Sequence, residues 1–292
     1  MRHVDQREVS VNGLDITYLV CGTGPLALCL HGFPDTAATW RHLFDPLANQ
    51  GYTVVAPWLR GYAPSGLAPD GSYQTAALAA DALALHDQLG GDGDAVIIGH
   101  DWGAMTAYGA AVAEPQRWRR VVTLAVPPMP ALATSFFNYE QIRRSFYMFF
   151  FQSPLAEVAV AMNELEFIAK LWRDWSPGFD AARSGDLENV RRALGDPANL
   201  SAAIGYYRAM FDPTRQRPEL AGLQESCAQI PPQPTLYLHG ADDGCLGASL
   251  THGVDALLSP GSQVELVADA GHFLQLEQPA IVNQHIIDFL TA

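Results

Sequence analysis

The sequence predicts an α/β fold with a mostly parallel, doubly wound sheet that is interrupted by a helical cap. Short apolar runs alternate with helical stretches over roughly the first 125 residues. The alternation stops after Pro127, where aromatic-rich helical stretches take over, and it resumes at Thr235. Alternating strands and helices are typical of a parallel sheet covered on both faces. We therefore expect an α/β core at 1–128 and 228–292 and a helical cap domain at 129–227.

The elements follow from local patterns along the chain. Glu8–Val11 and Leu14–Val20 alternate around Asn12-Gly13, which favours a type I′ hairpin turn. Further strands are expected at Leu26–Leu30, Tyr52–Ala56, Ala95–Ile98, Val121–Leu124, Thr235–His239 and Val264–Val267. Core helices are expected at Thr39–Ala48, Gln74–Leu89, Ala104–Ala113, Gly247–Leu258 and Ala280–Leu290, and cap helices at Gln141–Gln152, Leu155–Trp172, Leu187–Leu194 and Leu200–Phe211.

Composition excludes several classes of partner. A net charge of −14 disfavours nucleic acid and anionic membrane surfaces. The polar N-terminus lacks an apolar signal core, and the apolar run Phe146–Phe151 is far shorter than the roughly 20 residues that span a bilayer. The four cysteines have neither CxxC nor zinc spacing, which predicts reduced structural thiols and no metal. We expect a cytoplasmic protein.

Asp101 is the first candidate catalytic residue, because it lies between two glycines in Gly99-His-Asp-Trp-Gly103. An apolar run precedes this segment and small residues follow it, as in the strand–turn–helix of a nucleophile elbow. The glycines permit a turn sharp enough to hold the central side chain clear of the backbone. A carboxylate gains little by attacking an ester, since the anhydride would revert, but it can displace a leaving group at saturated carbon. We therefore expect hydrolysis of an epoxide or an alkyl halide.

A base and its acidic partner are expected after the last two strands. His272 is the candidate base, because an imidazole with an ordinary pKa near 6.5 can take a proton from water at neutral pH. Asp242 and Asp243 both lie in the loop after the preceding strand, and either could orient the base. The backbone N–H groups of Phe33, in His31-Gly-Phe-Pro34, and of Trp102 are candidates for an oxyanion hole.

Together these segments resemble the epoxide hydrolases of the α/β-hydrolase superfamily over nearly the whole chain. The chain order of nucleophile, acid and base is the order of that fold. The resemblance favours Asp243 as the acid, since the family places it fourth in a Gly-x-x-Asp loop, here Gly240-Ala-Asp-Asp243. The segment Arg60–Ser65 departs from the family pattern at Ala63 and Pro64, which leaves the geometry of that turn open.

The cap carries the most specific part of the resemblance. In the family two cap tyrosines donate hydrogen bonds to the epoxide oxygen, which needs an acid because an alkoxide is a poor leaving group. The segment Tyr147–Glu157 matches the first tyrosine motif and Gly205-Tyr-Tyr-Arg208 matches the second, so the resemblance assigns Tyr147 and Tyr207. Tyr206 is about 100° away around the helix and should not face the same oxygen.

The resemblance implies an epoxide hydrolase that acts on an ether bond, forms a vicinal diol through an aspartyl ester and needs no cofactor. A haloalkane dehalogenase with the same Asp101 is the main alternative, and a hydrolase of unknown substrate is a broader one. Aromatic residues of the cap indicate an apolar small-molecule substrate, although at least half of them should form the cap's own core. That group consists of Phe146, Phe149, Phe150, Phe151, Phe167, Trp172 and Trp175. The sequence does not decide the oligomeric state, and a homodimer would pair through the apolar surface of the cap.

Overall fold

The computed structural model describes residues 2–292, apart from the side chains of residues 134 and 135. Its strands form an eight-stranded sheet in the order β1-β2-β4-β3-β5-β6-β7-β8. The strands β1 and β2 run antiparallel to their neighbours, and β3 to β8 pair in parallel. Their bounds are Asp5–Val11, Leu14–Gly22, Leu26–Leu30, Thr53–Pro57, Val96–His100, Arg120–Leu124, Thr235–Gly240 and Gln263–Val267 for β1 to β8 in turn.

The hairpin prediction is confirmed. Val11 pairs with Leu14, so the loop holds two residues, and Asn12 and Gly13 have φ angles of 51° and 74°. Two consecutive positive φ angles are the requirement of a type I′ turn, and Asn and Gly meet it at the lowest steric cost.

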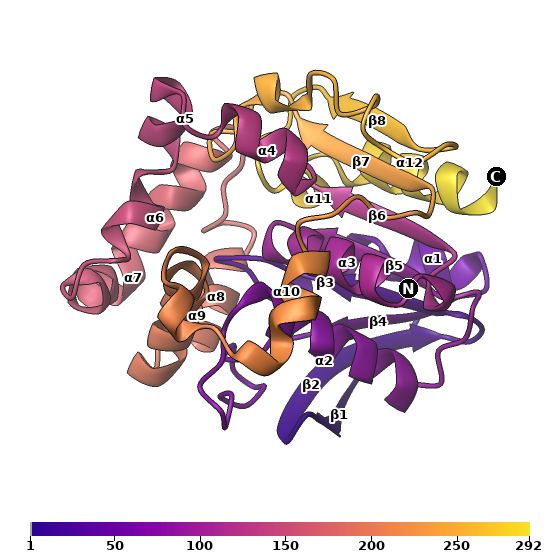
Figure 1. Ribbon diagram of the computed structural model, residues 1–292, viewed down its shortest axis with the longest axis horizontal. Helices are drawn as coiled ribbons and strands as arrows, with labels where there is room; N and C mark the ends of the chain where they lie inside the picture. The colour runs from indigo at the N-terminus through magenta and orange to yellow at the C-terminus, as the bar shows by residue number, and fades with distance from the viewer. Residues whose placement is uncertain (1) are drawn as a thin grey trace.

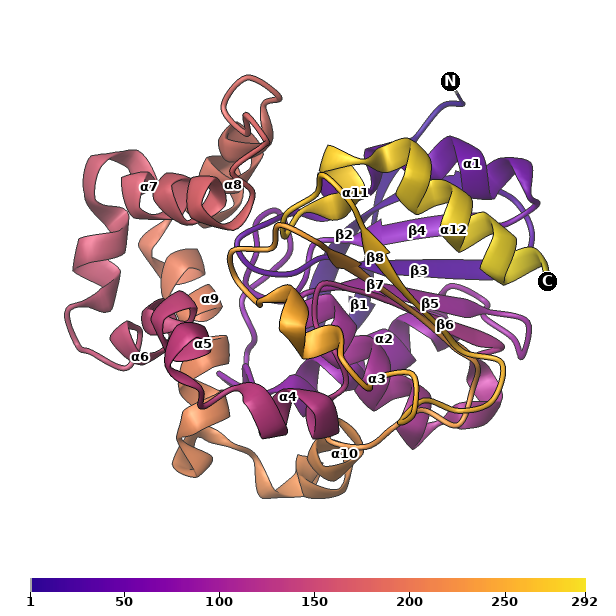
Figure 2. The same cartoon turned by 90° about the horizontal axis from the view of Figure 1, so that it is seen from above.

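Helices cover both faces of the sheet (Figure 2). Ile97 and Ile98 of β5 belong to different apolar clusters, since successive strand residues point to opposite faces. One face packs against α2 (Thr75–Gln88) and α3 (Trp102–Ala113), with α10 (Ala221–Ser226) on the outside of these two helices, and the other face packs against α1 (Phe44–Asn49), α11 (Leu274–Glu277) and α12 (Pro279–Thr291). The doubly wound α/β fold predicted from the sequence is confirmed.

All elements described between β6 and β7 are helices. They are α4 (Met129–Ser135), α5 (Tyr139–Arg144), α6 (Phe146–Phe150), α7 (Ala156–Trp175), α8 (Asp186–Leu194), α9 (Pro197–Phe211) and α10, with short 3₁₀ turns before α10. Helices α5 to α9, which we call the helical layer, lie together to one side of the sheet (Figure 1). In contrast, α10 packs on α2 and α3 of the core. We keep 129 and 227 as the proposed bounds of the cap.

The prediction of one continuous helix at Thr39–Ala48 was wrong. The chain forms a 3₁₀ helix at Ala37–His42 and then α1. Pro46 has no N–H to donate to the carbonyl of His42, and this carbonyl accepts from the Asn283 side chain at 2.6 Å instead. The helix therefore restarts with Pro46 in its first turn.

Two cap helices are also interrupted. The predicted Gln141–Gln152 divides at Ser145, whose hydroxyl is held by the Gln141 side chain. Helix α7 contains a non-helical turn at Met162–Leu165, with three successive positive φ angles from Asn163 onward. Nothing in the local sequence marks that turn.

The helix predicted at Gly247–Leu258 was wrong as well. It is reduced to a 3₁₀ turn at Ala248–Thr251, because Gly253 takes a φ of 76° and ends it. Among residues 2–292 no helix is long and apolar enough to cross a membrane.

The loop that departs from the family pattern is held firmly. The guanidinium of Arg60 is buried and donates to Asp81 and to the carbonyl of Ser72. Ser65 accepts from the N–H of Thr17 at 3.0 Å, which ties the loop to β2. These buried hydrogen bonds fix the loop against β2 and α2.

Candidate active site

The turn at 99–103, which we call the elbow, projects Asp101 at the carboxyl end of β5. Asp101 has φ 52° and ψ −116°, a conformation that costs a non-glycine residue about 1–3 kcal/mol. A Cβ on Gly103 would lie 2.1 Å from the carbonyl oxygen of Leu30, and one on Gly99 would lie 2.1 Å from that of Gly103. Only glycine fits at these positions, so Gly99 lets the turn close on Gly103, and Gly103 lets the elbow pack against β3.

The Asp101 carboxylate lies against the loop that follows β3. Its Oδ1 accepts a hydrogen bond of 2.7 Å from the N–H of Phe33. A Cβ on Gly32 would lie 2.3 Å from Oδ1, so the loop approaches the carboxylate as closely as glycine allows. Trp102 is the first residue of α3, where N–H groups lack an acceptor within the helix. Both predicted oxyanion-hole residues therefore lie beside Asp101.

His272 and Asp243 meet next to Asp101. The Nδ1 of His272 lies 2.9 Å from Oδ2 of Asp243, and its Nε2 lies 3.6 Å from Oδ2 of Asp101. Nε2 is buried without a hydrogen-bond partner. The neighbouring carboxylate, Asp242, is exposed, so Asp243 is the one that contacts the imidazole.

The carboxylates determine the charge of His272. Burial lowers the pKa of this imidazole, but the charge of Asp243 and the proximity of Asp101 outweigh burial and raise the pKa to about 10. Burial opposes ionisation of Asp243, yet the charge of His272 keeps the pKa of Asp243 below its ordinary value. At neutral pH the site therefore holds an imidazolium bonded to the Asp243 carboxylate, with Asp101 on its other side.

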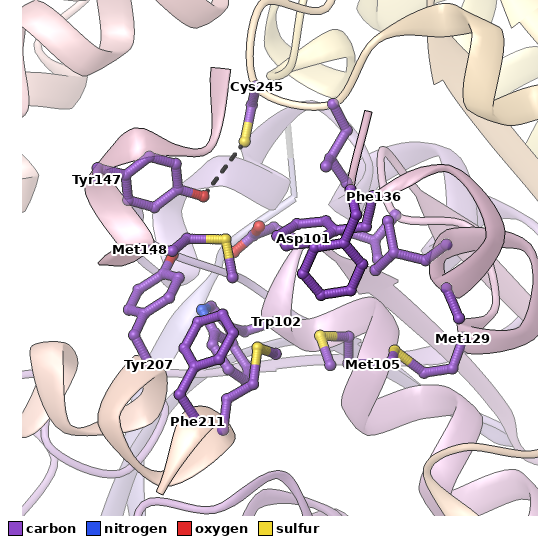
Figure 3. A pocket seen from close by; sticks show the side chains of 16 residues that line it. Asp101, Trp102, Met105, Met129, Phe136, Tyr147, Met148, Tyr207, Phe211 and Cys245 are labelled. Atoms are coloured by element: carbon purple, nitrogen blue, oxygen red, sulfur yellow. Dashed lines mark hydrogen bonds between the residues drawn. The ribbon is translucent and has the colours of Figure 1, made fainter. Parts of the chain in front are cut away.

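Tyr147 and Tyr207 enter the same cavity from α6 and α9 (Figure 3). Their rings meet edge to face, with centroids 5.4 Å apart. The Tyr147 hydroxyl lies 3.5 Å from Sγ of Cys245, and the Tyr207 hydroxyl is buried without a hydrogen-bond partner. Burial raises the pKa of both phenols, so both are protonated donors. Tyr206 points elsewhere and donates to the carbonyl of Arg60 at 2.7 Å.

The cavity has a volume of about 210 Å³ and an almost entirely apolar lining. Asp101 lies at its inner end (Figure 3). Phe137 and Phe211 line it and are exposed, so it opens to solvent between them. The rest of the wall is Trp102, Met105, Val126, Met129, Leu132, Ala133, Phe136, Tyr147, Met148, Tyr207, Met210, Cys245 and Leu246. None of the seven aromatic residues considered for the channel lines this cavity. Phe151, Trp172 and Trp175 are instead buried between the helical layer and the core, where their rings pack against Phe33, Phe273 and His272 respectively.

Sequence reasoning missed Cys245 and Gln141. Cys245 is a buried free thiol, as expected, but it also lies in the cavity beside Tyr147. The side chain of Gln141 holds the loop that carries Asp243 and Cys245. Neither belongs to a motif, and only their spatial neighbours reveal them. Asp243, Cys245 and His272 each offer an atom that could bind a metal, and these atoms lie within 4.8 Å of one another. Asp243 and His272 are hydrogen-bonded to each other.

Comparison with known proteins agrees with this fold. The model of the α/β hydrolase fold family matches residues 25–279. The chain is 30% identical to the AB hydrolase superfamily protein YfhM of Bacillus subtilis, with 97% of this chain and 96% of that protein aligned. It is also 30% identical to an epoxide hydrolase of Caballeronia sordidicola, over 98% of this chain and 94% of that one.

A solved structure of a putative epoxide hydrolase from Klebsiella pneumoniae superimposes with a TM-score of 0.85. It has 25% sequence identity to this chain, over 98% of this chain and 97% of that one. The similarity thus extends from the first strands through the helical layer to the last helix. The chain belongs to the α/β hydrolase fold family.

Proposed function

We propose that the protein is an epoxide hydrolase that converts an apolar epoxide to a vicinal diol through an ester on Asp101, without a cofactor. One observation carries the proposal: a carboxylate and two protonated tyrosines line a single apolar cavity. The carboxylate can attack a carbon of an epoxide, and the tyrosines can protonate its oxygen. The relatives named epoxide hydrolase support the same activity.

In the first step Asp101 attacks one carbon of the epoxide, and the C–O bond at that carbon breaks. The ring oxygen takes a proton from Tyr147 or Tyr207, so no free alkoxide has to leave. The Tyr207 hydroxyl has no hydrogen bond of normal geometry, and Trp102 and Tyr147 are its polar neighbours, so it is available to the substrate. The product of this step is a hydroxyalkyl ester of Asp101.

In the second step water cleaves the ester. Esterification removes the negative charge of Asp101, one of the groups that raise the pKa of His272. The imidazolium then gives up its proton, which restores the tyrosine, and the neutral imidazole accepts a proton from water. Hydroxide adds to the ester carbonyl, whose oxygen is stabilised by the N–H groups of Phe33 and Trp102. Collapse breaks the C–O bond to the substrate, and the leaving alkoxide takes the proton of the added hydroxyl group, which releases the diol and restores the carboxylate beside the imidazolium.

Asp243 would hold the imidazole during both steps. Its Oδ2 bonds Nδ1, which directs Nε2 toward Asp101, where the ester forms. This is the task of the third group in a nucleophile–base–acid triad. Asp101 and His272 would therefore act directly on the substrate, and Asp243 would act through His272.

A panel of epoxides and haloalkanes tests the proposal. Styrene oxide, a terminal aliphatic epoxide, a trans-disubstituted epoxide and haloalkanes are incubated with the protein, with Asp101→Ala and with Tyr147→Phe/Tyr207→Phe. We expect diol formation by the native protein and its loss in both variants. Halide release that survives the loss of both tyrosines would identify a dehalogenase instead. No turnover of either class would contradict the proposal.

A further inference from the structure

We propose that Gln141, in the helical layer, is a positioning residue for the water-dependent half of the reaction. It would act by holding the turn at 243–247, which we call the acid turn. The inference rests on the proposed function and adds a residue of α5 that lies outside the cavity and outside the motifs.

The amide of Gln141 is buried and makes three hydrogen bonds. Its Nε2 donates to the carbonyl of Cys245 at 2.9 Å and to the hydroxyl of Ser145 at 2.8 Å. Its Oε1 accepts from the N–H of Gly247 at 3.0 Å. One side chain therefore binds a carbonyl and an N–H of the acid turn at once, which fixes the turn's orientation as well as its distance from α5.

The acid turn orients the Asp243 carboxylate toward His272. The N–H groups of Cys245 and Leu246 donate to Oδ1 of Asp243, at 2.7 Å and 2.9 Å, which leaves Oδ2 for His272. The Cys245 thiol lies beside the Tyr147 hydroxyl. The bonds from Gln141 end on Cys245 and Gly247, so they hold the backbone that aims the Asp243 carboxylate.

A second contact from the helical layer supports this arrangement. The carbonyl of Trp175, at the end of α7, accepts from the N–H of Gly244 at 3.1 Å and from the N–H of His272 at 3.0 Å. It thus joins the acid turn to the loop of the base. The guanidinium of Arg144, on α5, also donates to the carbonyl of Asp243. The core strands end before these loops, so helices α5 and α7 complete their support.

The two steps should depend on Gln141 to different extents. Ester formation uses Asp101, which is held by the elbow, and the tyrosines, which are held by α6 and α9. Ester hydrolysis requires His272 in the orientation that Asp243 imposes. Loss of the amide should therefore slow hydrolysis far more than ester formation.

The test compares Gln141→Met with a matched control, Gln233→Met. Gln233 is also a buried glutamine that bonds two backbone carbonyls, those of Ala111 and Pro115, but it lies outside the acid turn and the cavity. Rapid quenching and intact-protein mass spectrometry with an epoxide that the native protein converts give the rates of ester formation and decay. In Gln141→Met we expect ester decay to slow by about tenfold or more and ester formation to change by less than about threefold. The control should keep both rates.

The inference would be overturned if Gln141→Met slowed ester formation and ester decay equally, or slowed neither of them. Arg144→Met repeats the test at a half-buried position if Gln141→Met does not fold, and we expect a smaller slowing of ester decay in the same direction. If the native protein forms no ester with any epoxide, the proposed function itself fails and the inference fails with it. If the native protein shows both steps and Gln141→Met changes neither rate, only the role of Gln141 is contradicted.

Discussion

The elbow and the acid turn present two carboxylates to one imidazole, but they are built in different ways. The elbow lies within five consecutive residues, between a buried strand and its helix, and its shape depends on Gly99 and Gly103. The acid turn follows β7, and its backbone groups are bonded by Gln141 and Trp175, about 100 and 70 positions earlier in the chain. The elbow is therefore a local structure, whereas the acid turn depends on packing of the helical layer against the core.

The largest expected effect is on the chemistry of the acid turn. Asp243→Asn should lower turnover by about 10⁴-fold, because the amide favours the wrong tautomer of the base. The ester should accumulate, since Asp101 still attacks, and intact-protein mass spectrometry would detect it. Asp242→Asn is the matched control, because that carboxylate is exposed one residue away and should be dispensable. A variant that loses turnover without accumulating ester would contradict the division into two steps.

The second largest effect should come from the elbow, and it should be on stability. Gly103→Ala places a methyl group 2.1 Å from the Leu30 carbonyl oxygen, where only backbone can give way. We expect a loss of about 3 kcal/mol or more in the free energy of unfolding, measured in urea. Gly222→Ala is the control, because a Cβ there meets no neighbour within 4 Å and alanine favours α10. Equal stability of the two variants would show that the elbow tolerates more than its geometry indicates.

The imidazolium links the two regions and makes stability depend on pH. The pKa of His272 is about 10 in the folded site and near 6.5 in the unfolded chain, so its contribution is complete below about pH 6.5 and is lost as the pH rises toward 10. We expect the free energy of unfolding to fall by roughly 2 kcal/mol between pH 7 and 9.

Urea titrations at several pH values test this dependence and sharpen the comparison. Asp243→Asn should weaken the pH dependence of the free energy of unfolding more than Asp101→Asn does. The reason is that Asp243 is 2.9 Å from the ring of His272 and Asp101 is 3.6 Å from it. The opposite ranking of the two variants would assign the main electrostatic partner of His272 to the elbow.

The smallest effect concerns the contact between the acid turn and α7. A Cβ on Gly244 would lie 1.9 Å from the carbonyl oxygen of Asp174, so Gly244→Ala should force the turn and the helix end apart. We expect a loss of about 1–2 kcal/mol, smaller than for Gly103→Ala because the helix end can move as a unit. Hydrogen exchange should increase at the end of α7 and leave β5 protected. Faster exchange in β5 would mean that the two regions are not structurally independent.

Structural features that adjacent residues determine were predictable from the sequence. The hairpin turn, the strands β3 to β8 and the elbow are each encoded by a few adjacent residues, through steric limits on φ and continuous apolar runs. Asp101 and His272 were proposed for a related reason, since Asp101 follows directly on the buried strand β5 and His272 lies five residues after the end of the last strand, β8. The strands in turn bring their carboxyl ends to one edge of the sheet, so residues far apart in sequence meet there.

The tertiary structure distinguishes residues that look equivalent in the local sequence pattern. Asp242 and Asp243 are adjacent carboxylates in one loop, and only the course of the turn buries one against His272 and exposes the other. The apolar pattern of the cap likewise did not separate residues that line the cavity from those that pack the helical layer. Both outcomes depend on burial by distant segments.

The sequence by itself determined the order of the strands along the chain and the places of Asp101 and His272 after strand ends, because backbone sterics and apolar runs act over a few residues. Only the tertiary structure decided the breaks in the cap helices, the place of Cys245 and the bonds of Gln141. A buried polar group takes its partner from whatever segment the fold brings within hydrogen-bonding distance, and in this protein the partners of the acid turn come from another part of the chain.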